Sequence, residues 1–399
     1  MLPKTFIPVA RPNLGQEEVS AAGRAILSGW VTQGPEVAAF EKEFAAYVGA
    51  PHACAVSSGT AALHLALLAV GILPGDEVIT VSHSYIATAN SIRYCGALPV
   101  FVDVEPQTFN IDAGKIEPAI GDRTRAILCV HQMGMPCDLQ SILEIAARHK
   151  IAVVEDAACA VGSEILFKSK CEKIGKPHAD VACFSFHPRK LLTTGDGGML
   201  TSADPELDRK FRLWRQHGMS VPDTVRHGSP QVVFESYPEL GFNYRMTDIQ
   251  AAVGREQLMR LPEAIAHRRK LAARYHDLLA DIPGLIFPKE PDWARTNWQS
   301  YCVRLPDHAD QRKVMQQMLD EGIATRRGIM CAHLEPAYSA PNTWRCAQAQ
   351  CKPGGSCPNL VESERAQNQG IILPLFDTLT EEQQAKVAQS LRSCIAMQS

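Results

Sequence analysis

Short apolar segments alternate with helical patterns over the first half of the chain. Seven segments rich in β-branched and other apolar residues predict strands: Ala53–Val56, Glu77–Ser82, Leu98–Val104, Arg125–His131, Ile151–Glu155, Val181–Phe186 and Gly198–Ser202. Most of them lack strict alternation with polar residues, which indicates strands buried on both faces. Helical patterns lie between them, at Ala61–Val70, Ala87–Cys95, Leu139–His149 and Pro205–His217. The sequence therefore predicts an α/β domain around a mostly parallel, seven-stranded sheet.

The pattern changes after about residue 250. Asp248–Leu279 has the pattern of one long helix, Gln299–Leu305 that of a strand, and Thr380–Ser393 that of a closing helix. A chain of 399 residues is long enough for two domains. We expect a large α/β domain over residues 1–250, with an N-terminal arm, and a smaller C-terminal α+β domain over residues 251–399.

Composition narrows the class of protein. The net charge of -3 argues against nucleic acid as the main partner, because phosphate binding needs a strong positive field. No apolar run is long enough to span a bilayer, so we expect no membrane partner. Thirteen cysteines without regular spacing fit reduced thiols better than a disulfide framework. These features predict a cytoplasmic protein.

Polar residues follow several of the predicted strands, where ligands bind in open α/β sheets. In "SSGTAALHLAL", Ser58, Gly59 and Thr60 precede a strong helix, and the free N–H groups there can hold a phosphate. By itself this segment also fits an ordinary capped helix. Tyr85, in "HSYIATAN", can stack on a flat ring or simply fill the space between strand and helix.

Two further strand ends carry side chains that can take part in catalysis. Asp156, in "VVEDAACAVG", can hold a proton on a pyridine nitrogen, or can cap a helix. In "FSFHPRKLLTTGDGGML", Lys190 follows Ser185 and His187, and a buried lysine amine is a nucleophile and a base. The phosphate site, the aromatic, the carboxylate and the lysine are together the contacts that pyridoxal phosphate needs.

Longer motifs at these residues resemble a known family. They are "SGWVTQGPEVAAFEKEFAAYVG", "SSGTAALHLAL", "PVFVDVEPQTFNID", "VVEDAACAVG", "FSFHPRK…TTGDGGML", "GFNYRMTDIQAA", "HLEPAY" and "LPLFDTLTEEQ". With them the chain resembles the DegT/DnrJ/EryC1/StrS aminotransferases, sugar aminotransferases among the fold-type I pyridoxal phosphate enzymes. The resemblance extends from Gly29 to Leu391.

The resemblance implies a role for each matching residue. Lys190 matches the catalytic lysine that binds the cofactor covalently and shuttles protons. The cofactor contacts that it implies are Ser58, Gly59, Thr60 and Ser185 for the phosphate, Tyr85 over the ring and Asp156 at the ring nitrogen. Asn243 matches an asparagine that reaches the phosphate of the neighbouring subunit. A homodimer with shared active sites follows from that match.

The expected reaction moves an amino group from glutamate to the keto group of a nucleotide-linked sugar of the 4-keto-6-deoxy type. The cofactor alternates between its pyridoxal and pyridoxamine forms, and glutamate leaves as 2-oxoglutarate. The alternatives are a keto-cyclitol or aminoglycoside precursor as acceptor, or a non-catalytic regulatory protein that keeps the fold. We expect the substrate near Trp30, His187, His333 and Tyr338.

The chain also departs from the family pattern. Cys159 stands where the family usually has Gln or His, beside the hydroxyl of the cofactor ring. A loop with Cys346, Cys351 and Cys357 looks like an insertion. The irregular spacing of these cysteines and the lack of an obvious fourth ligand favour reduced thiols over zinc, so we expect no metal.

Overall fold

An eight-stranded sheet organises the chain in this computed structural model, which describes residues 6–221, 226, 229–347, 351 and 354–398. The strand order is β1-β9-β8-β5-β4-β2-β3-β13. Their bounds are β1 His52–Val56, β2 Glu77–Val81, β3 Leu98–Val102, β4 Thr124–Val130, β5 Ala152–Asp156, β8 Val181–Ser185, β9 Gly198–Ser202 and β13 Arg345–Cys346. Among the described residues, β9 is antiparallel to both neighbours and the other neighbouring pairs are parallel. The mostly parallel sheet is confirmed, and β13 adds an eighth strand to the predicted seven.

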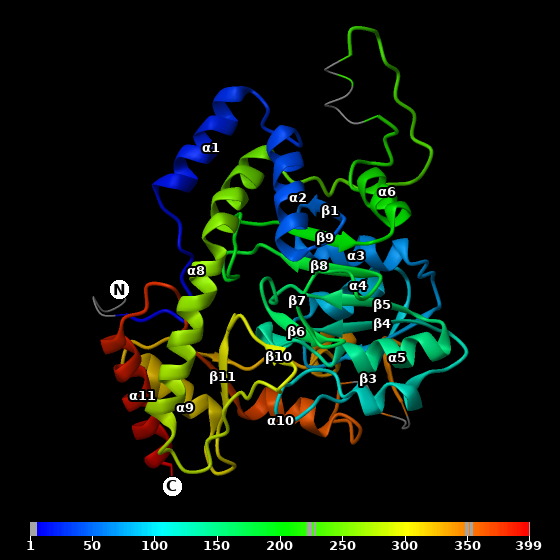
Figure 1. The fold of residues 1–399 in the computed structure, drawn as a ribbon. Coiled ribbons are helices and arrows are strands. Elements are labelled where there is room, and N and C mark those ends of the chain that lie inside the picture. The colour runs from blue at the N-terminus through cyan, green and yellow to red at the C-terminus, as the bar shows by residue number, and fades with distance from the viewer. Residues whose placement is uncertain (1–5, 222–225, 227–228, 348–350, 352–353, 399) are drawn as a thin grey trace.

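Helices cover both faces of this sheet because its central strands are buried on both sides. One hydrophobic cluster joins the sheet to α3 (Gly59–Ala69), α4 (Ala87–Tyr94) and α6 (Pro205–Trp214). Another joins the opposite face to α2 (Pro35–Val48), α5 (Leu139–His149) and the first half of α8 (Asp248–Leu279). These layers form the α/β architecture that the alternating pattern predicts (Figure 1).

The long helix α8 links two hydrophobic cores. It begins at a capping box formed by Thr247 and Gln250, and its bounds match the sequence prediction. Its C-terminal half packs on a second cluster with β11 (Tyr301–Arg304), α9 (Gln311–Asp320), β14 (Gly370–Leu373) and α11 (Glu381–Ala396) (Figure 1). The short strand β12 (Arg326–Arg327) pairs with β14. Along α8, the contacts pass from the first hydrophobic cluster to the second between Ile265 and Leu271. The domain boundary between residues 250 and 251 stays a prediction.

Smaller elements complete the described chain. α1 (Gln16–Ser28) packs along α8, and α10 (Val361–Gln369) precedes β14. A hairpin of β6 (Glu164–Phe167) and β7 (Lys170–Lys173) is extended by β10 (Ala294–Arg295). Short 3-10 helices η1 to η5 cover Ala113–Lys115, Glu117–Ala119, Gln132–Gly134, Ala332–Leu334 and Pro336–Tyr338.

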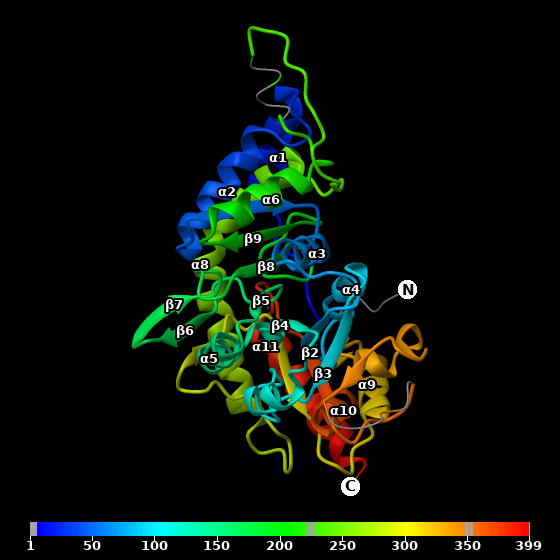
Figure 2. The ribbon, with the colours of Figure 1, turned by 90° about the vertical axis from the view of Figure 1, so that its right-hand side faces the viewer.

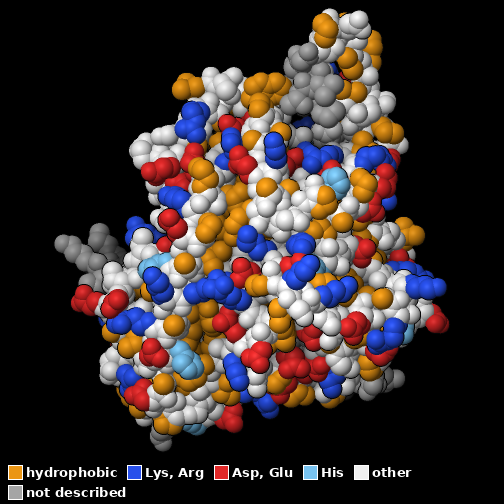
Figure 3. All heavy atoms as spheres, in the orientation of Figure 1, with side chains coloured by type: hydrophobic (Ala, Val, Ile, Leu, Met, Phe, Trp, Pro, Cys, Tyr) orange, Lys and Arg blue, Asp and Glu red, His pale blue; other side chains and the backbone are white. Residues whose placement is uncertain are grey.

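One connection projects far from the body of the molecule. In both ribbon views, the described residues between α6 and α8 rise beyond α1 and α2 (Figures 1 and 2). Val232, Phe234 and Leu240 on this connection are each more than 80% exposed, and Leu27 on α1 is 89% exposed. Hydrophobic atoms accordingly lie open to solvent along the top of the molecule (Figure 3). No helix among the described residues is both long and apolar enough to cross a membrane.

Candidate active site

Several of the predicted site residues lie at one edge of the sheet because of the register of four strands. Val56 at the end of β1 and Ser185 at the end of β8 both pair with Gly198, the first residue of β9. On the other side of β8, the parallel strand β5 ends at Asp156, which pairs with Cys183. The expected convergence of strand ends is therefore present.

The start of α3 forms a close-packed turn against β8 and β9. Ser58 is the N-cap residue of α3, and its Oγ accepts a hydrogen bond from the N–H of Ala61 at 3.1 Å. A Cβ on Gly59 would lie 2.7 Å from Cβ of Ser185, and one on Gly198 would lie 2.5 Å from the carbonyl oxygen of Ser58. Within the described residues, the N–H groups of Gly59 and Thr60 donate to no acceptor. These N–H groups are the kind of site that binds an anion.

Asp156 is a buried carboxylate at the end of β5, with 5% of its surface exposed. Its Oδ2 accepts a hydrogen bond from the hydroxyl of Thr88 at 2.7 Å, and its Oδ1 accepts one from the N–H of Ala158 at 3.2 Å. No ion pair involves Asp156 among the described residues, whereas the adjacent Glu155 pairs with His131 at 2.8 Å. A buried carboxylate is normally balanced by a cation, so Asp156 is suited to a positively charged ligand group.

Lys190 lies in the turn that follows β8, half-buried, and its Nζ donates to Sγ of Cys159 at 3.0 Å. Cys159 belongs to the loop that follows Asp156, so the lysine amine contacts the same loop that begins at the buried carboxylate. Cys159 is in turn held by Asn297, whose side-chain amide donates to the carbonyl oxygens of Cys159 and Val161. Cys159, which stands where the family usually has Gln or His, is therefore in direct contact with the lysine amine.

Gln299 is a positioning residue that the sequence analysis missed. It is buried, its Oε1 accepts from the N–H of Leu191 at 2.9 Å, and its Nε2 donates to the carbonyl oxygen of Arg189 at 2.6 Å. These bonds hold the backbone on both sides of Lys190. Arg268 of α8 secures Gln299 by donating to its carbonyl oxygen at 3.3 Å. A glutamine more than 100 residues away carries no local signal of this role.

The predicted ligand contacts other than the lysine and the carboxylate differ in their surroundings. Tyr85 is 60% exposed after β2, and Asn243 is exposed on a segment that pairs with Gln216. Trp30 is half-buried beyond α1. His187 is half-buried; burial and the positive charge of Arg189 lower its pKa. All four side chains keep exposed surface and stay predicted ligand contacts.

His333 and Tyr338, which we expected near the substrate, are both buried. The His333 side chain is 0% exposed; its Nδ1 lies 2.6 Å from Oγ of Ser82 and its Nε2 lies 3.1 Å from Oε1 of Glu364. The hydroxyl of Tyr338 donates to Oδ1 of Asn90 at 2.8 Å, and the residue is 2% exposed. Because their polar atoms are buried and already bonded, we no longer assign these two side chains a substrate contact.

The cysteine loop also differs from expectation. Cys351 and Cys357 are joined by a disulfide, so the interpretation of these two as reduced thiols is wrong in this structure. Their sequence separation of six residues gave no indication of the pairing, because it depends on how the loop turns back on itself.

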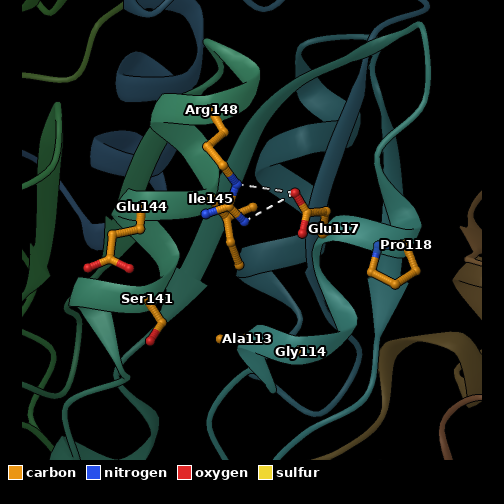
Figure 4. Close-up of a pocket in the computed structure, with 8 residues that line it drawn as sticks. All are labelled: Ala113, Gly114, Glu117, Pro118, Ser141, Glu144, Ile145 and Arg148. Carbon is orange, nitrogen blue, oxygen red and sulfur yellow. Dashed lines mark hydrogen bonds and ion pairs between the residues drawn. The ribbon is translucent and has the colours of Figure 1, made fainter.

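A hollow on the surface is a separate feature. It has a volume of about 600 Å³ and lies between η1, η2 and α5 (Figure 4). Arg148 and Glu117 form an exposed ion pair across it at 3.1 Å. None of the predicted site residues lines it, so we do not connect it with the chemistry at the sheet edge.

Fold and site together define an α/β enzyme in which a lysine amine, a buried carboxylate and a helix N-terminus meet at the carboxyl edge of the sheet. The chain belongs to the DegT/DnrJ/EryC1/StrS aminotransferase family, whose model matches residues 12–392. The members that it resembles are pyridoxal-phosphate-dependent sugar aminotransferases, so the fold-type I architecture and the enzyme class are confirmed.

Three similar proteins show how far the likeness extends. GDP-perosamine synthase of Caulobacter vibrioides is 43% identical over 382 residues, which cover 94% of this chain and 98% of that protein. The sugar aminotransferase Spr1654 of Streptococcus pneumoniae, solved in its PLP form, has a TM-score of 0.87 at 26% identity and covers 99% of this chain and 100% of its own. DesI, solved with its TDP-sugar product, has a TM-score of 0.84 at 29% identity and covers 99% and 94%.

Proposed function

We propose that this protein is a pyridoxal-phosphate-dependent aminotransferase that moves an amino group from glutamate to the keto group of a nucleotide-linked sugar of the 4-keto-6-deoxy type. The observation that carries the proposal is Asp156, a buried carboxylate with no basic partner among the described residues. A protonated pyridine nitrogen would supply the missing positive charge.

The residues present fit this cofactor. The N-terminus of α3, with Ser58, Gly59 and Thr60, would hold its phosphate together with Ser185. Asp156 would bind the ring nitrogen, and Tyr85 would cover the ring. When bound, the cofactor supplies an aldehyde that takes up the amino group and a ring that withdraws electrons. The Nζ of Lys190 would bind the cofactor and then hold and return the proton that moves during transfer.

The relatives support the substrate class. One is named for a GDP-linked sugar, and another was crystallised with a TDP-sugar product. Trp30 and His187 are the residues that we propose near the sugar. A keto-cyclitol or aminoglycoside precursor is the alternative acceptor. The many cysteines that are buried as thiols fit the cytoplasm, the compartment that we propose.

Two measurements test the proposal. The protein mixed with pyridoxal phosphate should show a visible absorption band that borohydride removes, and mass spectrometry should then find the cofactor on Lys190. Lys190→Ala should lose both the labelled peptide and turnover, whereas Lys115→Ala on η1 should keep them. A panel of nucleotide-linked keto sugars with glutamate would identify the acceptor. If the wild-type protein binds no cofactor, it is a non-catalytic relative.

We also propose a homodimer with shared active sites. Burial of the exposed apolar side chains Val232, Phe234, Leu240 and Leu27 against a second copy would remove apolar surface from water. Asn243 follows the same connection and is exposed. In a dimer this arrangement would let Asn243 of one chain reach the phosphate held by the other.

A mixing experiment tests the shared site. Lys190→Ala and a variant with a bulky residue at 243 should each be inactive, yet regain part of the activity after subunit exchange, because one hybrid site has both intact groups. Asn243→Ala alone should weaken cofactor affinity. If heterodimers form without any gain in activity, or if the active species is a monomer, the shared-site proposal is wrong.

A further inference from the structure

Three cysteines of the loop before α10 come together in the folded chain. Their Sγ atoms all lie within 4.8 Å of one another. Cys346 belongs to β13, the strand that pairs with β3 at the edge of the sheet, while Cys351 and Cys357 lie further along the loop. The described residues that lead from this strand towards α10, in orange, lie beside β3 and α10 (Figure 2). Sequence spacing argued against a metal, but the fold gathers the three sulfur atoms at one place.

The disulfide between Cys351 and Cys357 accounts for only two of these sulfur atoms. Three converging thiolates are soft ligands of the kind that select zinc. A Zn–S distance of about 2.3 Å in a tetrahedral site places sulfur atoms about 3.8 Å apart. Two of the sulfur atoms are bonded to each other in the disulfide and would have to separate to that value after reduction, whereas Sγ of Cys346 already lies within 4.8 Å of both.

The surroundings are suited to such an ion. Cys346 and Cys357 are buried in an apolar cluster with Trp344, Phe101 and Leu360, which shields them from solvent. The side-chain amide of Asn359 donates to Sγ of Cys346 at 3.5 Å, a contact of the type that supports metal-bound thiolates. Arg345 donates to the carbonyl oxygen of Cys346 at 3.5 Å, and its guanidinium is paired with Glu77.

We propose that Cys346, Cys351 and Cys357 bind one zinc ion as three thiolates once the disulfide is reduced. Among the described residues, no His, Asp, Glu or further Cys joins these three ligand atoms, so a water molecule or a small anion would complete the tetrahedron. The ion ties the edge strand β13 to the loop that leads into α10. Asp103 at the end of β3 accepts hydrogen bonds from the N–H groups of Glu362 and Ser363, which anchors the same helix.

The experiment uses the full chain with its cofactor. A phosphine reductant opens the disulfide and is itself oxidised to the phosphine oxide with the oxygen of one water molecule, which leaves two thiols. Zinc chloride then displaces the three thiol protons. After desalting without oxygen, plasma mass spectrometry should find one zinc ion per chain in the wild type and in Cys171→Ser, an exposed cysteine on β7. Cys346→Ser, which leaves the disulfide pair intact, should bind at least tenfold less.

Two further measurements test whether the three cysteines bind the metal. Cobalt in place of zinc should give sulfur-to-metal charge-transfer absorption in the wild type and lose it in Cys346→Ser. Zinc should raise the melting temperature of the wild type and not that of the variant. Equal zinc content in both proteins overturns the proposal, as does a wild-type chain that stays metal-free because its disulfide resists reduction. The visible absorbance of bound pyridoxal phosphate reports separately on the proposed active site.

Discussion

The substitution Asp156→Asn removes the negative charge of the side chain but keeps its hydrogen bonds within the fold. Asparagine has nearly the same shape, its Oδ1 can still accept from the N–H of Ala158, and the hydroxyl of Thr88 can turn to accept from the new amide. The apoprotein should therefore unfold at the same urea concentration as the wild type or a slightly higher one, because an unpaired buried charge has been removed.

The loss should appear in the reaction instead. Breaking a buried pair of charges costs about 3–5 kcal/mol. The pairing of Asp156 with the ring nitrogen should contribute most in the transition state, where the ring withdraws electrons. Each 1.36 kcal/mol lost there lowers the rate by a factor of about ten, so the rate should fall by about two to four orders of magnitude. The assay follows the half-reaction with glutamate through the change in visible absorbance, with cofactor affinity titrated separately.

Thr88→Val is the matched control. It removes a hydrogen bond to the carboxylate that is present throughout the reaction, so it should lower apoprotein stability by about 1.5–3 kcal/mol and change the rate by less than tenfold. A near wild-type rate in Asp156→Asn would refute the reasoning and leave Asp156 as a residue that only caps the following turn.

Three more outcomes are expected. Glu41→Gln breaks a buried ion pair with α6 and the following turn and should lower the free energy of unfolding by about 3–5 kcal/mol in urea titrations, whereas the exposed pair of Glu43 is worth at most about 1 kcal/mol in Glu43→Gln. Burial raises the pKa of the Glu41 carboxyl, but the charges of Arg215 and Arg212 outweigh burial and lower this pKa below 4.5. The stabilisation by the Glu41 ion pairs is therefore present at neutral pH and is lost as the pH falls through the folded-state pKa. Plots of the free energy of unfolding against pH for the wild type and Glu41→Gln should accordingly converge in acid. Gly59→Ala forces the start of α3 from β8 and should weaken pyridoxal phosphate binding by about one to two orders of magnitude, while Gly23→Ala, with open space around it, should not; equal affinity in both would remove the phosphate role.

The sequence by itself determined the layered fold and the main chemical groups. Buried strands are continuous apolar runs, and α8 begins where Thr247 and Gln250 form a capping box, so both can be read from neighbouring residues. Ser185, Asp156 and Lys190 were predictable because polar groups that directly follow apolar strands lie at the ligand-binding edge. The hairpin of β6 and β7 was missed because each strand has only four residues and β7, with the sequence KCEK, has no apolar alternation.

Only the tertiary structure decided how distant residues meet. The contacts of Gln299 with the backbone beside Lys190 join residues more than 100 positions apart, and His333 is buried between Ser82, which follows β2, and Glu364 of α10. The two-residue strand β13 is too short for any periodic signal, yet it brings Cys346 to the other loop cysteines. Periodicity and spacing report on local backbone geometry, whereas these contacts depend on how the helices and sheets pack.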